Sequence, residues 1–147
     1  TVKGLQCTLV VVGRLSDAQR RGLEASEIEY ENYVGISANK LIREYVKSDM
    51  LVFASLYEGF GMPIIEAQLV GRPVVTSDLS SMPEVAGKGA CLVDPASVSN
   101  IRLSIERVLT DTEYRNTLVA EGRLNASRFD ASKIAEQYCA VYHSICA

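Results

Sequence analysis

Two glutamates, Glu58 and Glu66, stand eight positions apart and enclose a glycine-rich turn, Gly59-Phe60-Gly61. A carboxylate accepts hydrogen bonds and does not donate them. Glycines let a ligand approach the backbone closely, and free N–H groups at the start of a helix attract anions. The turn and the helix start that follows it therefore fit a phosphate group.

The turn lies where a predicted strand gives way to a predicted helix. The run from Asp49 to Ala54 predicts the strand, so Glu58 follows its carboxyl end. The helix is predicted over Pro63 to Val70, with Pro in its first turn and Gly71 just past its end. Because only two of its positions are polar, we expect this helix to be buried, with Glu66 in its first turn. For Glu66 alone, a first-turn or capping-box role beside the helix dipole is an equal alternative.

Elsewhere the chain alternates short β-branched runs with longer helical patterns, which is typical of parallel strands covered by helices. Further strands are predicted at Cys7 to Val12, Tyr30 to Val34, Pro73 to Ser77 and Ala90 to Val93. We therefore predict an α/β fold with one open, doubly wound, mostly parallel Rossmann-like sheet. Ligands bind such sheets at the carboxyl ends of the strands.

Helical patterns flank and follow these strands. Ser37 is a plausible N-cap for a helix that runs to Lys47, and three further helices follow the last strand. Asp130 is expected to cap the final helix. The positions of that helix expected to face inward are Ile134, Tyr138, Val141 and Ile145. No linker or repeat divides the chain, so residues 1–147 are predicted to form a single domain.

Composition narrows the function classes. The 147 residues have a net charge of −3 and 48% hydrophobic residues, as expected for one globular domain. No block of Lys and Arg points to nucleic acid, and no apolar stretch approaches the roughly 20 residues of a membrane span. The four cysteines form no CxxC pair and have no His nearby at ligand spacing, so we expect reduced, buried thiols, a cytoplasmic location and no metal site.

The segment from Glu58 to Ala67 resembles the E-x7-E signature of glycosyltransferase family 4, also called group 1, whose members have the two-Rossmann-domain GT-B architecture. The likeness continues in Gly71 to Asp78, in Met82 to Gly87 and in Cys91 to Pro95. From about Leu9 to its end, the chain resembles the C-terminal, donor-binding domain of that family.

The resemblance implies a role for each matching residue. Glu58 would face the hydroxyls of the donor sugar as the catalytic-site carboxylate, and Glu66 would hold the ribose hydroxyls. The turn between them would bind the donor, with backbone N–H groups of Phe60, Gly61 and Met62 offered to sugar and phosphate. The donor-binding turn therefore comprises Gly59, Phe60, Gly61, Met62 and Pro63. The segment that would lie near the nucleobase comprises Val34, Gly35 and Ile36.

The resemblance also implies parts that lie outside this sequence. The family carries an Arg and a Lys on the first strand and helix of this domain, where they neutralise the diphosphate. Gly13-Arg14 follows what the register makes the second strand, so we expect those basic residues before Thr1. An N-terminal acceptor-binding domain of the same protein is expected as partner. The chain is then a fragment of a two-domain enzyme, inactive alone, that is cytoplasmic or peripheral at the inner membrane face when complete.

The implied reaction moves a sugar from a nucleoside-diphosphate sugar to an acceptor with retention of anomeric configuration, and it needs no metal or other cofactor. Uridine, guanosine and adenosine diphosphate sugars all remain candidate donors. Two alternatives belong to other classes: a GT-B sugar-nucleotide epimerase, and a non-enzymatic flavodoxin-like binding module. The Gly-Phe-Gly turn with Glu66 counts against the first, and the lack of an acidic pair after Val12 counts against the second.

Overall fold

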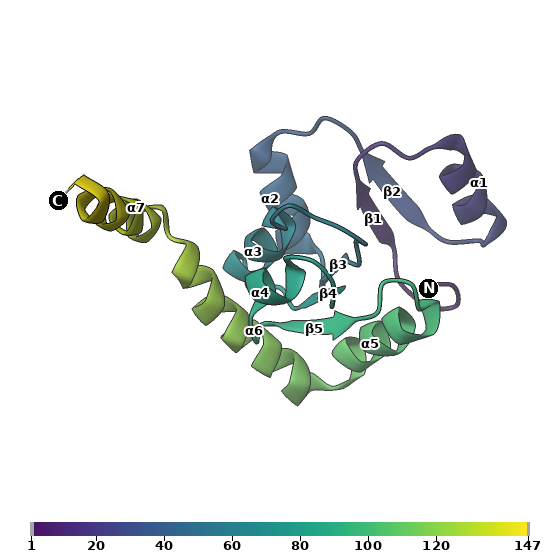
Figure 1. The fold of residues 1–147 in the computed structure, drawn as a ribbon. Helices are drawn as coiled ribbons and strands as arrows, with labels where there is room; N and C mark the ends of the chain where they lie inside the picture. Colours follow the sequence, from purple (N-terminus) through teal and green to yellow (C-terminus); the bar gives the residue numbers. More distant parts are fainter. Residues whose placement is uncertain (1, 147) are drawn as a thin grey trace.

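A computed structural model describes residues 2–146, and these form an α/β domain with helices on both sides of parallel strands (Figure 1). The strands are β1 (Leu9–Val12), β2 (Tyr30–Tyr33), β3 (Leu51–Phe53), β4 (Val74–Ser77) and β5 (Ala90–Val93). The helices are α1 (Asp17–Ala25), α2 (Ala38–Lys47), α3 (Met62–Leu69), α4 (Met82–Ala86), α5 (Val98–Thr110), α6 (Thr112–Ala126) and α7 (Ala131–Cys146), with a 3-10 turn, η1 (Ser127–Phe129), before α7. All five predicted strands are present, and most are shorter than predicted.

Strands β3, β4 and β5 form one parallel sheet in that order, and this sheet is the centre of the domain. Strand β4 is buried along its whole length. Val74 packs on one side with α3, α4 and the end of α6, whereas Val75 packs on the other with α5 and the beginning of α6. Two separate apolar layers therefore cover the two faces, which confirms the doubly wound α/β class.

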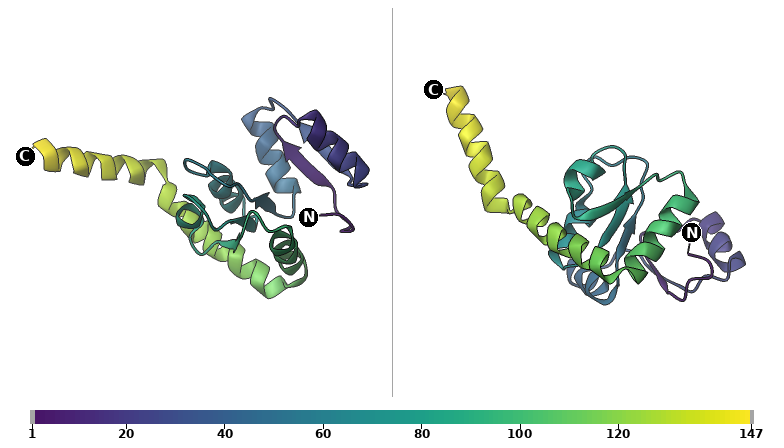
Figure 2. Two further views of the ribbon diagram at one scale, coloured as in Figure 1. Left: turned by 45° about the vertical axis from the view of Figure 1, so that its right-hand side comes forward. Right: turned by 90° about the horizontal axis from the view of Figure 1, so that it is seen from below.

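The prediction of one continuous sheet is wrong, because β1 and β2 form a separate two-stranded parallel sheet. Every described residue of β1 and β2 is exposed or half-buried. Figure 2 shows this pair, with α1, set to one side of the three-stranded sheet. One edge of β1 and one edge of β3 thus lack a hydrogen-bonded neighbour among residues 2–146.

Helix α1 was not predicted. It has a complete capping box, in which Ser16 Oγ accepts from the Gln19 N–H and the Gln19 side chain accepts from the Ser16 N–H. None of its residues is buried, so its sequence lacks the long apolar stripe by which the other helices were recognised. Its N-terminal signal was nevertheless present in the sequence.

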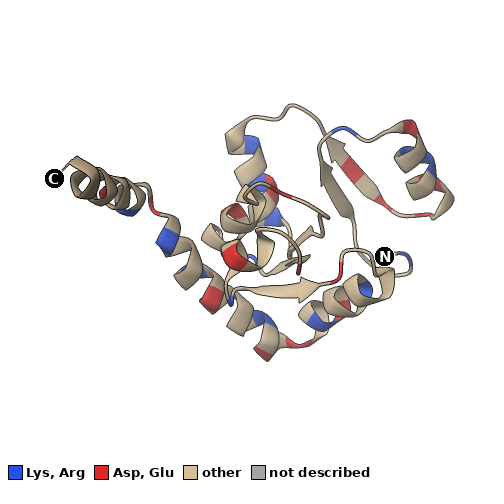
Figure 3. Ribbon diagram, in the orientation of Figure 1, with Lys and Arg blue, Asp and Glu red and all other residues tan. Residues whose placement is uncertain are grey.

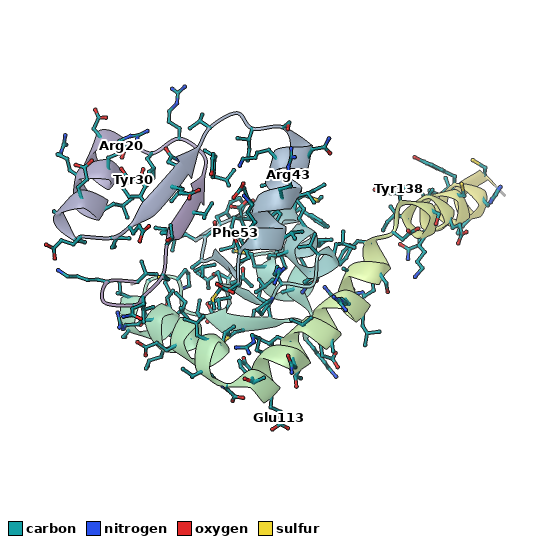
Figure 4. The ribbon with its side chains drawn as sticks, turned by 180° about the vertical axis from the view of Figure 1, so that it is seen from behind. Arg20, Tyr30, Arg43, Phe53, Glu113 and Tyr138 are labelled. Carbon is teal, nitrogen blue, oxygen red and sulfur yellow. The ribbon has the colours of Figure 1, made fainter. Side chains whose placement is uncertain are left out.

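The final helix is present, but its predicted inward-facing residues do not face a core. In α7, Tyr138 is 62% exposed and Ile145 is 75% exposed, and Val141 is also exposed. The ribbon views show α7 directed away from the rest of the domain, and Tyr138 lies on that distant segment (Figures 2 and 4). The predicted cap is confirmed, because Asp130 accepts from the Ser132 N–H. The Ser132 hydroxyl also donates to Asp130, and this bond, followed by the N–H bond, holds the pKa of Asp130 below its ordinary value.

The cysteine expectation is correct only in part. All four thiols are free, but Cys91 alone is buried, whereas Cys7, Cys139 and Cys146 are exposed. Two of the exposed thiols lie on α7, whose apolar side has no core to pack against within residues 2–146.

Figure 3 shows Lys and Arg distributed along the ribbon among Asp and Glu, in agreement with the absence of a basic block.

Candidate functional site

The start of α3 leaves its first backbone N–H groups without a cap. Strand β3 ends at Phe53, and the chain then bends through the glycine turn and enters α3 at Met62, one residue before the predicted start. Gly61 is the N-cap, in a left-handed conformation at φ +104°, and no side chain bonds to the helix start. Within residues 2–146 none of the N–H groups of positions 59 to 62 donates a hydrogen bond. These groups form a site suited to an anion or a hydroxyl oxygen.

Glu58 stands on the loop that leaves the carboxyl end of β3, half-buried. Its Oε1 accepts a hydrogen bond from Ser55 Oγ at 2.9 Å, which orients the carboxylate. Its backbone carbonyl accepts from Ser80 Oγ and Ser81 Oγ, at 2.9 and 3.0 Å. The loop that follows β4 therefore holds the loop that follows β3, and Glu58 lies where the two meet.

The two glycines of the turn have different structural explanations. At Gly61 the positive φ favours glycine, and a Cβ would come 3.2 Å from Ile64 Cδ1. At Gly59 the φ is not positive, and a Cβ would meet nothing within 4 Å. The fold itself therefore gives no steric reason for glycine at position 59, and a Cβ there would face open space.

Glu66 lies on α3 and is held from α2. The Tyr45 hydroxyl donates to Glu66 Oε2 at 2.9 Å, and both side chains are half-buried. Burial, and then this hydrogen bond, raise the pKa of Tyr45 above its ordinary value, so the phenol stays protonated and continues to donate. The predicted first-turn and capping roles of Glu66 are wrong, because it is the fifth residue of α3 and the helix has no side-chain cap.

A buried polar network anchors α3. Gln68 is 1% exposed and Asn125, on α6, is 6% exposed. Asn125 Nδ2 donates to Gln68 Oε1 at 2.8 Å and to the Val85 carbonyl at 2.7 Å, while Gln68 Nε2 donates to the Ala86 carbonyl at 2.9 Å. This network fixes α3 against α4 and α6, so the helix that carries Glu66 is rigidly placed.

The turn also contacts the end of α6. The rings of Phe60 and Phe129 meet edge to face, with centroids 5.7 Å apart and planes at 87°. Phe129 belongs to η1, directly before α7, and packs against the core cluster that contains Ile64 and Met82. The glycine turn is thus supported from beneath by apolar contact, while its N–H groups stay free.

The residues predicted to lie near a nucleobase are placed apart from the rest. Val34, Gly35 and Ile36 follow the carboxyl end of β2, in the smaller sheet, and Val34 is 53% exposed. In the part of the chain that the structure describes, no hydrogen bond joins this segment to the turn or to Glu66. Both segments nevertheless flank α2, since 34–36 precede its N-terminus and Tyr45 on that helix contacts Glu66.

A half-open cavity lies elsewhere in the domain. A cavity of about 530 Å³ lies at the opposite, amino ends of β3 and β4. It is lined by Asp49, Met50, Gly71, Arg72, Pro73, Leu109, Arg115, Asn116 and Val119. The glutamates and the turn form an open edge of the sheet instead. Since ligands of open α/β sheets bind at the carboxyl ends of the strands, we assign the candidate site to that edge.

Sequence reasoning missed four residues of this site: Tyr45, Ser55, Ser80 and Ser81. Ser55 precedes Glu58 by three positions, the short spacing at which a hydroxyl can reach a nearby carboxylate. The other three lie 21 to 23 positions from their partners, and no local pattern announces such contacts.

Residues 2–146 contain neither a cluster of metal ligands nor a membrane-spanning helix. No group of three or more His, Cys, Asp or Glu side chains there is arranged to hold a metal ion. No described helix combines the length and the apolar character that a bilayer crossing requires.

The family model "Glycosyl transferases group 1" matches residues 2–125, which contain the whole candidate site. The chain belongs to the group 1 glycosyl transferases. A relative of this family, O-antigen chain mannosyltransferase B of Escherichia coli, is 35% identical over 122 residues, covering 83% of this chain and 32% of the relative. The chain thus spans about a third of the length of that curated relative.

Solved structures agree on the fold of this group 1 chain. HepE of Anabaena, in complex with UDP and glucose, superposes with a TM-score of 0.84 at 21% identity, over 93% of this chain and 40% of that one. The C-terminal domain of the group 1 family protein LpcC of Francisella tularensis superposes with a TM-score of 0.72 at 22% identity, over 86% and 72%. The fold is therefore the Rossmann-like C-terminal half of a GT-B glycosyltransferase.

Proposed function

We propose that this chain is the donor-substrate domain of a retaining glycosyltransferase that uses a nucleoside-diphosphate sugar. The observation that carries the proposal is the junction of β3 and α3, where two carboxylates flank a run of free backbone N–H groups. Such a junction offers acceptors for sugar and ribose hydroxyls and donors for phosphate oxygens. Gly59, for which the fold gives no steric reason, supports close approach of a ligand.

Each part of the junction has a role in the proposal. Glu58, oriented by Ser55, accepts hydrogen bonds from the hydroxyls of the transferred sugar. The N–H groups of Phe60, Gly61 and Met62 bind sugar and phosphate oxygens. Glu66 binds the ribose hydroxyls through the lone pairs that Tyr45 does not use. Val34, Gly35 and Ile36, which precede the N-terminus of α2, lie toward the nucleobase.

When the bond between the sugar and the diphosphate breaks, negative charge develops on the leaving phosphate. Free N–H groups at the start of a helix stabilise such charge, because they are already oriented and the helix dipole has its positive end there. The transfer is proposed to retain the configuration of the anomeric carbon and to proceed without a metal ion. HepE, which shares the fold, was solved with UDP and glucose, and O-antigen chain mannosyltransferase B is named for hexose transfer.

The two separate sheets support a further part of the proposal. β1 and β3 each present an open edge, and the classic doubly wound order places the first strand of the fold between the second and the fourth. In this register β1 is the second strand and β3 the fourth. We propose that residues preceding Thr1 supply the strand between them, together with the Arg and Lys that neutralise the diphosphate, and an N-terminal acceptor-binding domain. The 147 residues alone are then expected to bind a donor weakly and to transfer nothing.

Calorimetric titration of the chain with UDP, GDP, ADP and their hexose derivatives tests the proposal. At least one of these should bind, and Glu66→Gln should weaken it about tenfold, since a charge-assisted hydrogen bond contributes roughly 1.5 to 3 kcal/mol. Glu113→Gln, on an exposed turn of α6, is the matched control and should leave affinity unchanged. Equal affinity of the Glu66 and Glu113 variants would contradict the proposed role of Glu66.

A further inference from the structure

The loop between β4 and α4 makes an unusual set of contacts with the candidate site. Ser81 is the N-cap of α4, a position where a serine side chain ordinarily accepts from the helix N–H groups. Here it makes no such bond. Its hydroxyl instead donates to two carbonyls of the glycine turn, that of Glu58 at 3.0 Å and that of Phe60 at 2.9 Å. The single hydroxyl proton is thus shared between carbonyls two residues apart.

Ser80 reinforces this contact. Its hydroxyl donates to the Glu58 carbonyl at 2.9 Å, so that carbonyl accepts from both serines. Ser80 has a φ of +58°, which non-glycine residues rarely adopt. The loop is braced before it, since Ser77, at the buried end of β4, accepts from the Leu79 N–H at 3.0 Å. Such a conformation is kept only where the surrounding contacts hold it, and the two hydrogen bonds to the Glu58 carbonyl and the Leu79 N–H bond supply such contacts.

The direction of these carbonyls determines the direction of two N–H groups. In a trans peptide the C=O and the following N–H point in opposite directions, and the described chain has no cis peptide bond. The carbonyls of Glu58 and Phe60 point at Ser81. The N–H groups of Gly59 and Gly61 therefore point away from Ser81, and neither donates a hydrogen bond within residues 2–146.

We propose that Ser81, assisted by Ser80, is a positioning residue that aims the N–H groups of Gly59 and Gly61 at the oxygens of the bound diphosphate sugar. This inference rests on the proposed function. It adds Gly59 to the N–H donors of the site and assigns the orientation of the turn to side chains of the β4–α4 loop. Phe129 supports the same turn through its contact with Phe60, so the turn is held by hydrogen bonds on one side and by a ring on the other.

Isosteric variants of Ser81 test the inference. Thr retains the hydroxyl and Val replaces it with a methyl group, so Ser81→Thr and Ser81→Val differ in hydrogen bonding and not in shape. Affinity is measured for UDP, GDP and ADP, and for the corresponding nucleosides, which lack phosphate. Ser81→Val should weaken the diphosphates about tenfold, as expected when two hydrogen bonds are misdirected, and leave the nucleosides unchanged. Ser81→Thr should remain within about twofold of the original chain.

Ser80→Ala is the matched partial variant, because it removes one of the two bonds to the Glu58 carbonyl and none to that of Phe60. It should weaken diphosphate binding by about twofold and displace the NMR signal of the Gly59 amide more than that of Gly61. In the ligand-free chain, Ser81→Val should shift the carbonyl carbon signals of both Glu58 and Phe60. These spectra test the hydrogen bonds from Ser80 and Ser81 to the turn even where a variant binds the ligand too weakly for its affinity to be measured.

The outcomes separate the inference from the proposed function. If the original chain binds a diphosphate and Ser81→Val binds it equally, with Gly59 and Gly61 amides still shifting, the positioning role is overturned and the proposed function stands. A uniform loss of diphosphate and nucleoside binding would show a merely structural role and would also overturn it. If the original chain binds none of the three diphosphates, the proposed function fails, and this inference with it.

Discussion

Asn125 connects the helix that carries Glu66 to the rest of the domain, and its removal is predicted to be costly. Asn125→Ala would leave Gln68 Oε1 and the Val85 carbonyl without their donor, and both atoms are buried beneath α6. Each buried acceptor left without a partner costs about 1 to 3 kcal/mol. For the two acceptors together, the free energy of unfolding should therefore fall by about 2 to 6 kcal/mol, a large share of the roughly 5 to 15 kcal/mol of an ordinary domain.

Urea denaturation followed by circular dichroism measures this change. Asn116→Ala, an exposed position of the same helix, is the control and should alter the free energy of unfolding by less than about 0.5 kcal/mol. Asn125→Asp should be nearly as destabilising as Asn125→Ala, because a carboxylate cannot donate to either acceptor. A loss of less than about 1 kcal/mol in Asn125→Ala would refute the view that this network holds α3 in place.

Three further predictions follow from other parts of the structure. Gly59→Ala should leave the chain as stable as before or slightly more stable, yet weaken diphosphate binding. Gly89→Ala should instead destabilise the chain strongly, because its Cβ would lie 2.3 Å from the Gly122 Cα. Urea denaturation measures the stabilities and calorimetry the binding, and a Gly59→Ala chain that unfolds at lower urea concentration than the Gly89→Ala chain would contradict this prediction. The free energy of unfolding should fall as the pH rises above 10, because burial raises the pKa of Tyr45 above 10.0 and that of Tyr114 to about 12 in the folded chain. The stability that a raised pKa contributes is complete only at pH values below the pKa of the same group in the unfolded chain. Tyr45→Phe should reduce that fall, and an unchanged slope would contradict the assignment. Amide hydrogen exchange should be slowest in β4 and at least about a hundredfold faster in β1 and β2, and equal protection of the two sheets would contradict their independence.

The junction of β3 and α3 could be predicted because its signals are local. An apolar run, two glycines and a proline within 15 residues specify a strand, a bend and a helix start, and α3 begins at Met62, one residue before the predicted start. The order of elements is readable from sequence for the same reason, since each predicted strand has its own apolar run. Local pattern also placed Asp130 at the start of α7.

The partners of the site could not be predicted, because they come from distant parts of the chain. Tyr45 reaches Glu66 only because α2 packs beside α3, and Ser81 reaches the turn only because the β4–α4 loop lies beneath it. Both contacts are properties of the packed elements, and no periodicity encodes them. The position of Glu66 in the second turn of α3 likewise depended on which residue begins the helix.

The final helix shows a different limit of sequence reasoning. The spacing of Tyr138, Val141 and Ile145 correctly indicates an apolar side of α7, but periodicity does not say whether that side meets a core within the chain. The division of the strands into two sheets shows the same limit. β1 has the composition of a buried strand, but its burial depends on a neighbouring strand that residues 2–146 do not provide.

Chemical-shift mapping of the isotopically labelled chain with UDP, GDP and ADP sugars tests the central claim most directly. The account predicts that the largest amide shifts fall within residues 58 to 66, with Gly59 and Gly61 among them, and that at equal, sub-saturating ligand concentration they are several-fold smaller in Glu66→Gln. Shifts confined to the cavity around Arg72 and Arg115, at the opposite ends of the strands, or no shift at millimolar ligand, would contradict it.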